Sequence, residues 1–246
     1  MRTIPFALLL LVMACARQST LPPAPQRLQF ELPTAAAGLR GAYVRDVGEA
    51  LVEVSAFFRA AGYTIAPESL LDSVVVLDWT PEVVARLAQS FGVPPEDIPS
   101  TFAGTVAGHT LFVVERERYH AIWTQLYADW RWTDEEYRRL IAHELTHRAH
   151  EVIAITRLDS ADRMGPPWFF EGLAVMSAGQ FDGAQEPLTP AEIDALVGAG
   201  RVPPVSYPLY GRLVRSLARR YALQTLIWRA AQAGFPGTLM GARGPR

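Results

Sequence analysis

The chain has 246 residues, of which half are hydrophobic, a fifth are charged and 10% are aromatic. This composition excludes an intrinsically disordered chain, a collagen-like repeat and a coiled coil. The 23 basic and 25 acidic side chains give a net charge of −2, so no basic footprint indicates nucleic-acid binding. The single cysteine, Cys15, can form neither an internal disulfide nor a cysteine-based zinc cluster. Any metal must therefore be held by histidine and carboxylate side chains.

The N-terminal residues have the pattern of a secretion signal. Arg2 precedes an apolar stretch from Ile4 to Ala14, which is shorter than the roughly 20 residues of a membrane span. The sequence Val-Met-Ala-Cys at its end resembles a bacterial lipobox. We therefore expect residues 1–14 to be a signal peptide and Cys15 to be lipidated, which would anchor the chain to a membrane of the bacterial cell envelope. The alternative is ordinary secretion after cleavage behind Ala16.

Proline-rich composition predicts that residues 15–37 form an extended tether after the lipidated cysteine. One folded domain, residues 38–246, follows the tether. Strand patterns are confined to residues 38–117, whereas helical patterns dominate residues 118–246. The sequence thus predicts an α+β fold, with a small N-terminal sheet and its helices followed by a mainly helical half.

Local patterns predict the elements of both parts. The first part should contain a helix over 38–61 closed by Gly62, a buried strand over 73–79, a helix from Pro81 to Gly92 with Thr80 as N-cap, and a hairpin over 101–115 whose second strand starts at Thr110. The second part should contain a long helix from a capping box at Thr133 and Glu136 to about Ile155, and helices over 168–178, 190–197 (capping box Thr189 and Glu192) and 209–233.

The long helix carries the motif His-Glu-Leu-Thr-His, residues 143–147. His143 and His147 are one helical turn apart, so both imidazoles leave the same face and can meet one ion at about 2.0–2.1 Å. Glu144 stands beside the first histidine, where its carboxylate can act as general base without binding the metal. Apolar or small neighbours indicate a buried helix; they are Leu140, Ile141, Leu145 and Ala149. The motif predicts a zinc site, and two histidines alone do not complete it.

A second motif, Trp-Phe-Phe-Glu-Gly-Leu-Ala, follows at residues 168–174. Together the two motifs resemble the gluzincin zinc peptidases, and within them the peptidase MA-like family, whose third zinc ligand is a glutamate in a W-x-x-E-G-x-A segment. The resemblance implies that His143, His147 and Glu171 bind one Zn²⁺ ion. It also implies a zincin-like fold and a zinc metallopeptidase that hydrolyses peptide or protein substrates with Glu144 as general base.

The resemblance implies two further parts of the site. An edge strand before the motif helix binds extended substrate by strand addition, and the candidate residues are Thr110, Leu111, Phe112 and Val113. A tyrosine downstream hydrogen-bonds the oxyanion. Tyr207 and Tyr210 are both candidates for this role, and the sequence leaves the choice open.

The chain also departs from these peptidases. Thermolysin-like enzymes have an acid four residues after the ligand glutamate, where it orients a zinc histidine, and this chain has Val175 there. The partner that orients the histidine must come from elsewhere, and the sequence does not identify it. His150 lies two turns from His143, about 10.5 Å along the axis, and is too distant to bind the same ion.

Two other functions are compatible with the motifs. One is a catalytically weak zinc-binding protein that serves in envelope assembly, and the other is a zinc hydrolase of a non-peptide amide. The intact Glu144 argues against the first, because a structural zinc site needs no base. Substrate identity and the choice between endo- and exopeptidase stay open, because specificity lies in loop shapes.

Overall fold

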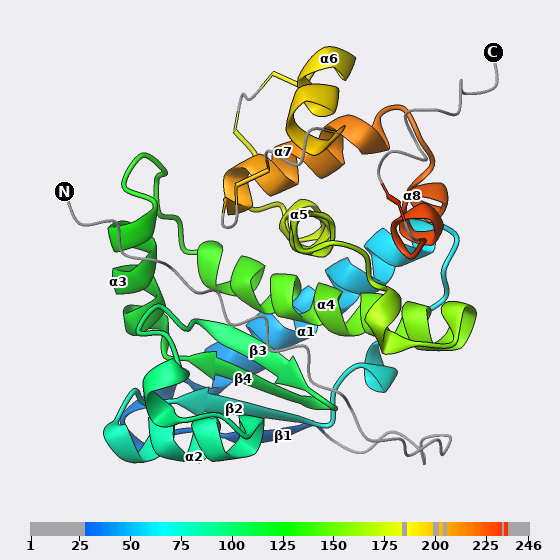
Figure 1. Cartoon of the computed structure of the whole chain (residues 1–246). Coiled ribbons are helices and arrows are strands. Elements are labelled where there is room, and N and C mark those ends of the chain that lie inside the picture. Colours follow the sequence, from blue (N-terminus) through cyan, green and yellow to red (C-terminus); the bar gives the residue numbers. More distant parts are fainter. Residues whose placement is uncertain (1–27, 184–185, 199–201, 204–205, 233, 236–246) are drawn as a thin grey trace.

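A computed structural model describes residues 28–183, 186–198, 202–203, 206–232 and 234–235. The fold is mixed α+β, as the sequence predicts, with a small sheet followed by a helical half (Figure 1). The expected signal peptide and Cys15 lie outside the described residues. Among the described residues, no helix has the length and apolar character needed to cross a bilayer.

Four strands form the sheet in the order β1-β2-β4-β3. Their bounds are β1 Gln29–Glu31, β2 Ser73–Leu77, β3 Gly104–Ala107 and β4 Thr110–Val114. Strands β1, β2 and β4 run parallel to one another. Strand β3 pairs antiparallel with β4, and a tight turn at Gly108, where φ is +58°, joins the two. As a result β1 and β3 are the edges of the sheet.

Helices cover both faces of the sheet (Figure 1). The α-helices of the described residues are α1 Arg40–Ala60, α2 Pro81–Phe91, α3 Arg116–Leu126, α4 Glu136–Leu158, α5 Pro167–Ser177, α6 Pro190–Ile193, α7 Tyr207–Ala218 and α8 Leu223–Ala230. Successive side chains of a strand point to opposite faces. Leu111 and Val113 of β4 accordingly join the core under α1 and α4, whereas Phe112 packs toward α2. The long helix α4 is thereby held between the sheet and the helices of the second half.

Two glycines allow α5 and α7 to cross closely. A Cβ on Gly172 would collide with the backbone carbonyl of Tyr210, and a Cβ on Gly211 would collide with the side chain of Val175. At Gly172 the two backbones meet directly, and at Gly211 the Val175 side chain fills the space, which fixes α7 relative to α5.

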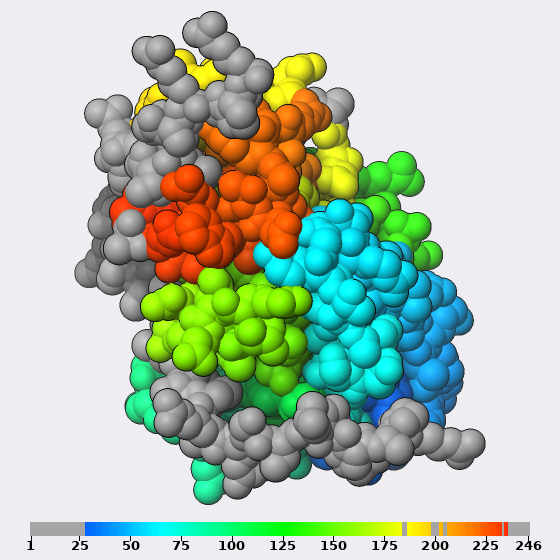
Figure 2. Space-filling view, turned by 90° about the vertical axis from the view of Figure 1, so that its right-hand side faces the viewer, coloured from blue at the N-terminus to red at the C-terminus, as the bar shows by residue number. Residues whose placement is uncertain are grey.

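The last described helix, α8, closes one side of the molecule (Figure 2). It lies against the end of α1 and against the connection between α4 and α5. A Cβ on Gly165, in that connection, would stand 2.8 Å from the Cβ of Ala230. Gly165 has a φ of +91°, so it supplies both the turn and the close approach.

Most predicted elements are confirmed with small changes in their ends. The Thr80 hydroxyl accepts a hydrogen bond from the Val83 N–H at 3.3 Å, and Gly92 ends α2 in the left-handed conformation. The capping box of Thr189 and Glu192 is present, although α6 is short and continues as a π-helical turn over Asp194–Gly198.

Three expectations about elements are wrong. Residues 28–37 belong to the fold and not to a tether, because β1 pairs with β2 and Ala36 is buried in the core. The long helix starts at Glu136 and has no capping box; the Thr133 hydroxyl donates to the Glu136 carboxylate at 3.2 Å instead. The helix expected over 209–233 is two helices, α7 and α8, since the chain turns between residues 219 and 222.

Candidate metal centre

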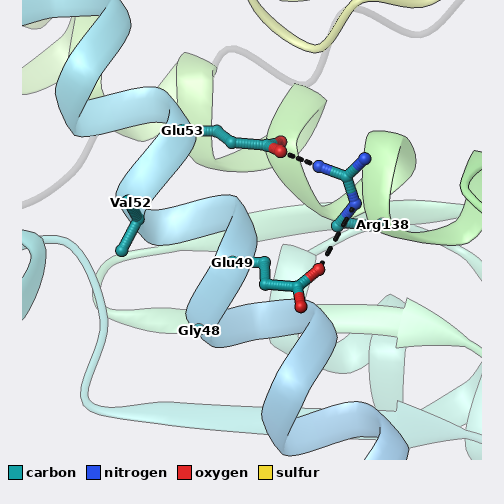
Figure 3. A pocket seen from close by; sticks show the side chains of 5 residues that line it. All are labelled: Gly48, Glu49, Val52, Glu53 and Arg138. Carbon is teal, nitrogen blue, oxygen red and sulfur yellow. Dashed lines mark ion pairs between the residues drawn. The ribbon is translucent and has the colours of Figure 1, made fainter.

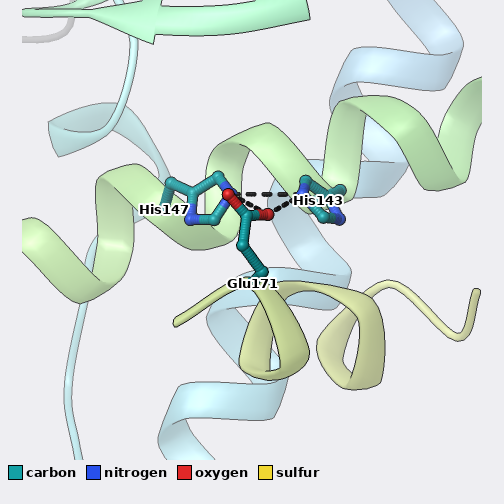
Figure 4. A group of neighbouring side chains, drawn as sticks. All are labelled: His143, His147 and Glu171. Carbon is teal, nitrogen blue, oxygen red and sulfur yellow. Dashed lines mark hydrogen bonds and ion pairs between the residues drawn. The ribbon is translucent and has the colours of Figure 1, made fainter. Parts of the chain in front are cut away.

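Three side chains from α4 and α5 converge on one point (Figure 4). The motif helix α4 presents His143 and His147 on one face, one turn apart, while its opposite face is buried in the core. α5 crosses this face, and Glu171 points from it toward the gap between the two imidazole rings. The structure thus brings together the three residues that the sequence predicts as metal ligands.

The spacing of the three donor atoms fits a single small cation. His143 Nε2 lies 3.1 Å from Glu171 Oε2 and 3.1 Å from His147 Nε2, and His147 Nε2 lies 3.3 Å from Glu171 Oε2. Donors that bind one Zn²⁺ tetrahedrally at 2.0–2.1 Å stand about 3.3–3.4 Å apart. Two imidazole nitrogens and one carboxylate are also a donor set that zinc prefers, with a fourth position open. The residues present therefore fit zinc.

The electrostatics of the triad favour a bound cation. Burial would raise the pKa of the Glu171 carboxyl, but His147 and His143 outweigh it and hold this pKa well below its ordinary value. Burial lowers the pKa of His147, but the Glu171 carboxylate overcomes it and raises this pKa above the usual value. A partly buried carboxylate that stays ionised next to two ring nitrogens is a site of negative potential.

Glu144 stands beside this triad and is not one of its converging donors. It lies between α4 and the edge strand β3, because a Cβ on Gly104 would be 3.2 Å from its Cγ. Burial raises the pKa of the Glu144 carboxyl, while the nearby His143 and His147 oppose that rise. Glu144 therefore lies beside the triad, on the side that faces β3.

Of the two candidate tyrosines, Tyr207 lies at the triad. Its ring centroid is 5.6 Å from that of His143. The charge of Glu171, together with burial, raises the pKa of Tyr207 well above its ordinary value, so the phenol stays a hydrogen-bond donor. Tyr210 packs against Tyr207, but its hydroxyl donates to the Pro203 carbonyl at 2.5 Å. The structure therefore favours Tyr207 as the phenol that faces the site.

The expectation that residues 110–113 form an edge strand is wrong. Thr110, Leu111, Phe112 and Val113 lie in β4, which pairs with β2 on one side and β3 on the other. A strand with partners on both sides has no free N–H and C=O row for a substrate. The edge next to Glu144 is β3, Gly104–Ala107, because the hairpin folds its first strand to the outside.

Sequence reasoning missed two residues of this region. The buried Gln180, which follows α5, lies with its Oε1 atom 2.9 Å from His143 Nδ1. Burial and the charge of Glu171 raise the pKa of Tyr127, at the end of α3, well above its ordinary value. Neither residue belongs to a motif, and both reach the site only through the fold. Val175, in the position of the missing acid, is buried against α7.

A separate hollow of about 430 Å³ lies on the surface between α1 and α4 (Figure 3). It is lined by Gly48, Glu49, Val52, Glu53 and Arg138, and Arg138 pairs with both glutamates. None of these residues belongs to the triad, so the hollow is not part of the candidate metal centre.

Comparison with known proteins adds nothing to this geometry: no family model, no curated protein and no solved structure matches the chain.

Proposed function

We propose that this chain is a zinc-dependent peptidase of the gluzincin kind, with a zincin-like fold and a site formed by α4, α5, α7 and β3. The observation that carries the proposal is the convergence of His143, His147 and Glu171 within 3.1–3.3 Å, with Glu144 beside them and outside the ligand set. A structural zinc site would need neither an open position nor an adjacent carboxylate.

The three ligands would hold the ion. When bound there, zinc would polarise the scissile carbonyl and lower the pKa of a water molecule toward about 7. Glu144 would accept the proton of the attacking water and pass it to the leaving amine, a role that the desolvated carboxyl suits because its pKa is raised. The neutral Tyr207 phenol would donate a hydrogen bond to the oxygen that becomes negative in the transition state.

The substrate would lie along β3. Among the described residues this strand has one free edge, and Gly104 has no side chain, so Glu144 packs directly against the strand. An extended peptide paired with β3 would pass between the edge strand and the triad, where its carbonyl meets the base. The proposed cellular setting is the bacterial envelope, with Cys15 as the lipid anchor and the domain outside the membrane.

Digestion of a peptide library tests the proposal. Wild-type protein loaded with zinc should cleave peptides, and a chelator should abolish cleavage. Glu144→Gln should keep the zinc and lose about 10²–10⁴-fold in rate, because it removes the base alone. Glu117→Gln, on the exposed first turn of α3, is the matched control and should retain full activity. Unchanged turnover in Glu144→Gln, or a zinc-loaded wild type that cleaves no peptide, would contradict the proposal.

A further inference from the structure

The imidazole of His143 makes contacts through both ring nitrogens. Its Nε2 atom faces Glu171 and His147, and its Nδ1 atom lies 2.9 Å from Oε1 of Gln180. Both His143 and Gln180 are buried, with 6% and 5% of their surfaces exposed. Water therefore competes little for a hydrogen bond with Nδ1, and the glutamine selects the tautomer of the His143 ring.

The amide of Gln180 also lies near the buried phenol of Tyr119. Burial is the main cause that raises the pKa of Tyr119 well above its ordinary value, and an interaction with the Gln180 side chain opposes the rise. The amide atom next to His143 Nδ1 is the oxygen, which can only accept a hydrogen bond, so Nδ1 must carry the proton.

The backbone around Gln180 is held in place by α5 and α7. The Gln180 N–H donates to the Val175 carbonyl at 3.1 Å. Arg215 of α7 donates to the carbonyl oxygens of Gln180 and Phe181, at 3.3 and 3.4 Å, and pairs with Asp182 at 2.8 Å. The same helix presents Tyr207 to the ring of His143. Residues 180–182 thus have fixed positions relative to the metal centre.

We propose that Gln180 is a positioning residue for the metal centre. Its side-chain oxygen accepts a hydrogen bond from the Nδ1–H group of His143, which directs the Nε2 lone pair toward the ion. This inference rests on the zinc centre of the proposed function. It assigns to a neutral amide the position that an acid occupies in thermolysin-like enzymes. A neutral acceptor orients the imidazole without adding a third negative charge near Glu144 and Glu171.

Zinc affinity of the full chain, measured by competition with a chromophoric chelator, tests this role. Gln180→Met keeps the length of the side chain but replaces the amide oxygen with a thioether, a weak hydrogen-bond acceptor, and it should bind zinc about 10–100-fold more weakly than wild type. Gln180→Glu restores an acceptor and should bind zinc at least as tightly as wild type. Gln89→Met, on the exposed face of α2, is the matched control and should bind zinc like wild type.

Two further measurements separate positioning from a structural role. Metal-free Gln180→Met should melt only a few degrees below the metal-free wild type, as expected for the loss of one buried hydrogen bond, and the visible spectrum of its Co²⁺ form should differ, because the ligand field changes when the ring turns. Wild-type zinc affinity in Gln180→Met would overturn the inference and leave the metal centre intact. A wild type that binds zinc but cleaves no peptide would overturn the proposed function and leave this inference standing. A wild type that binds no zinc would overturn both.

Discussion

At the scale of single residues, the two tyrosines of α7 differ in what their hydroxyls contact. Tyr207 stands against the ring of His143, whereas Tyr210 donates to the Pro203 carbonyl. Tyr207→Phe should therefore lower kcat by about 10²–10³-fold, as the loss of one oxyanion donor does, without loss of zinc. Tyr210→Phe should leave kcat within a few-fold and lower the free energy of unfolding by about 1 kcal/mol.

Steady-state kinetics and denaturant unfolding of the pair check this assignment. The two variants remove the same atom from neighbouring residues, so each is the control for the other. Equal losses of kcat in both variants would contradict a specific role for Tyr207.

His150 is a buried residue with a predictable pH effect. It is 1% exposed, and neither ring nitrogen has a hydrogen-bond partner among the residues that the structure describes. Burial, with a contribution from His147, lowers its pKa to about 3, against about 6.5 in an unfolded chain. Between these values the unfolded state binds a proton that the folded state does not. The free energy of unfolding should therefore fall with decreasing pH below about 6.5 and keep falling toward pH 3.

His150→Leu should remove this contribution. The variant should gain about 1 kcal/mol relative to wild type for each pH unit below 6.5. Urea unfolding of both proteins between pH 7 and 4.5, with chelator present so that metal release adds nothing, measures the difference. If the free energy of unfolding of both proteins changed with pH in the same way, His150 would take up its proton equally in the folded and unfolded chains, which would contradict the lowered pKa.

At the scale of elements, α5, which carries Glu171, crosses α7, which carries Tyr207. Gly172→Ala places a methyl group against the Tyr210 backbone, and it should cost about 1–3 kcal/mol of stability and shift Tyr207 from the site. Gly48→Ala, in the middle of α1, meets nothing within 4 Å and should stabilise the protein by about 0.5–1 kcal/mol. Thermal unfolding distinguishes the two substitutions by sign.

Elements with a strong local signal could be predicted, and those that depend on tertiary contacts could not. Thr80, Pro81 and Gly92 define the ends of α2 through backbone rules alone. The proposed metal ligands His143 and His147 follow from helical spacing in the same way. By contrast, the three-residue strand β1 exists because β2 offers it an edge, and Gln180 reaches His143 only after α5 has packed on α4. The order of strands also decides that β3, and not β4, is the free edge.

At the scale of the whole molecule, β1 extends the folded domain to residues before 38, where the sequence predicts a tether. Phe30 packs against the core and Ala36 is buried within it. A chain that starts at residue 38 should lose about 2–4 kcal/mol relative to one that starts at residue 28, as expected when one or two apolar side chains lose their burial. For a protein of this size that corresponds to a melting temperature several degrees lower. Equal melting temperatures would contradict the assignment of residues 28–37 to the fold.

The proposed peptidase activity requires one zinc ion between α4 and α5, where His143, His147 and Glu171 converge. Zinc content per chain, measured on wild type, His147→Ala and His120→Ala, tests it most directly. We expect one equivalent of zinc in the wild type and in His120→Ala, where an exposed histidine outside the triad is removed, and loss of zinc in His147→Ala. Full zinc content in His147→Ala would contradict the ligand assignment, and with it the catalytic site built upon it.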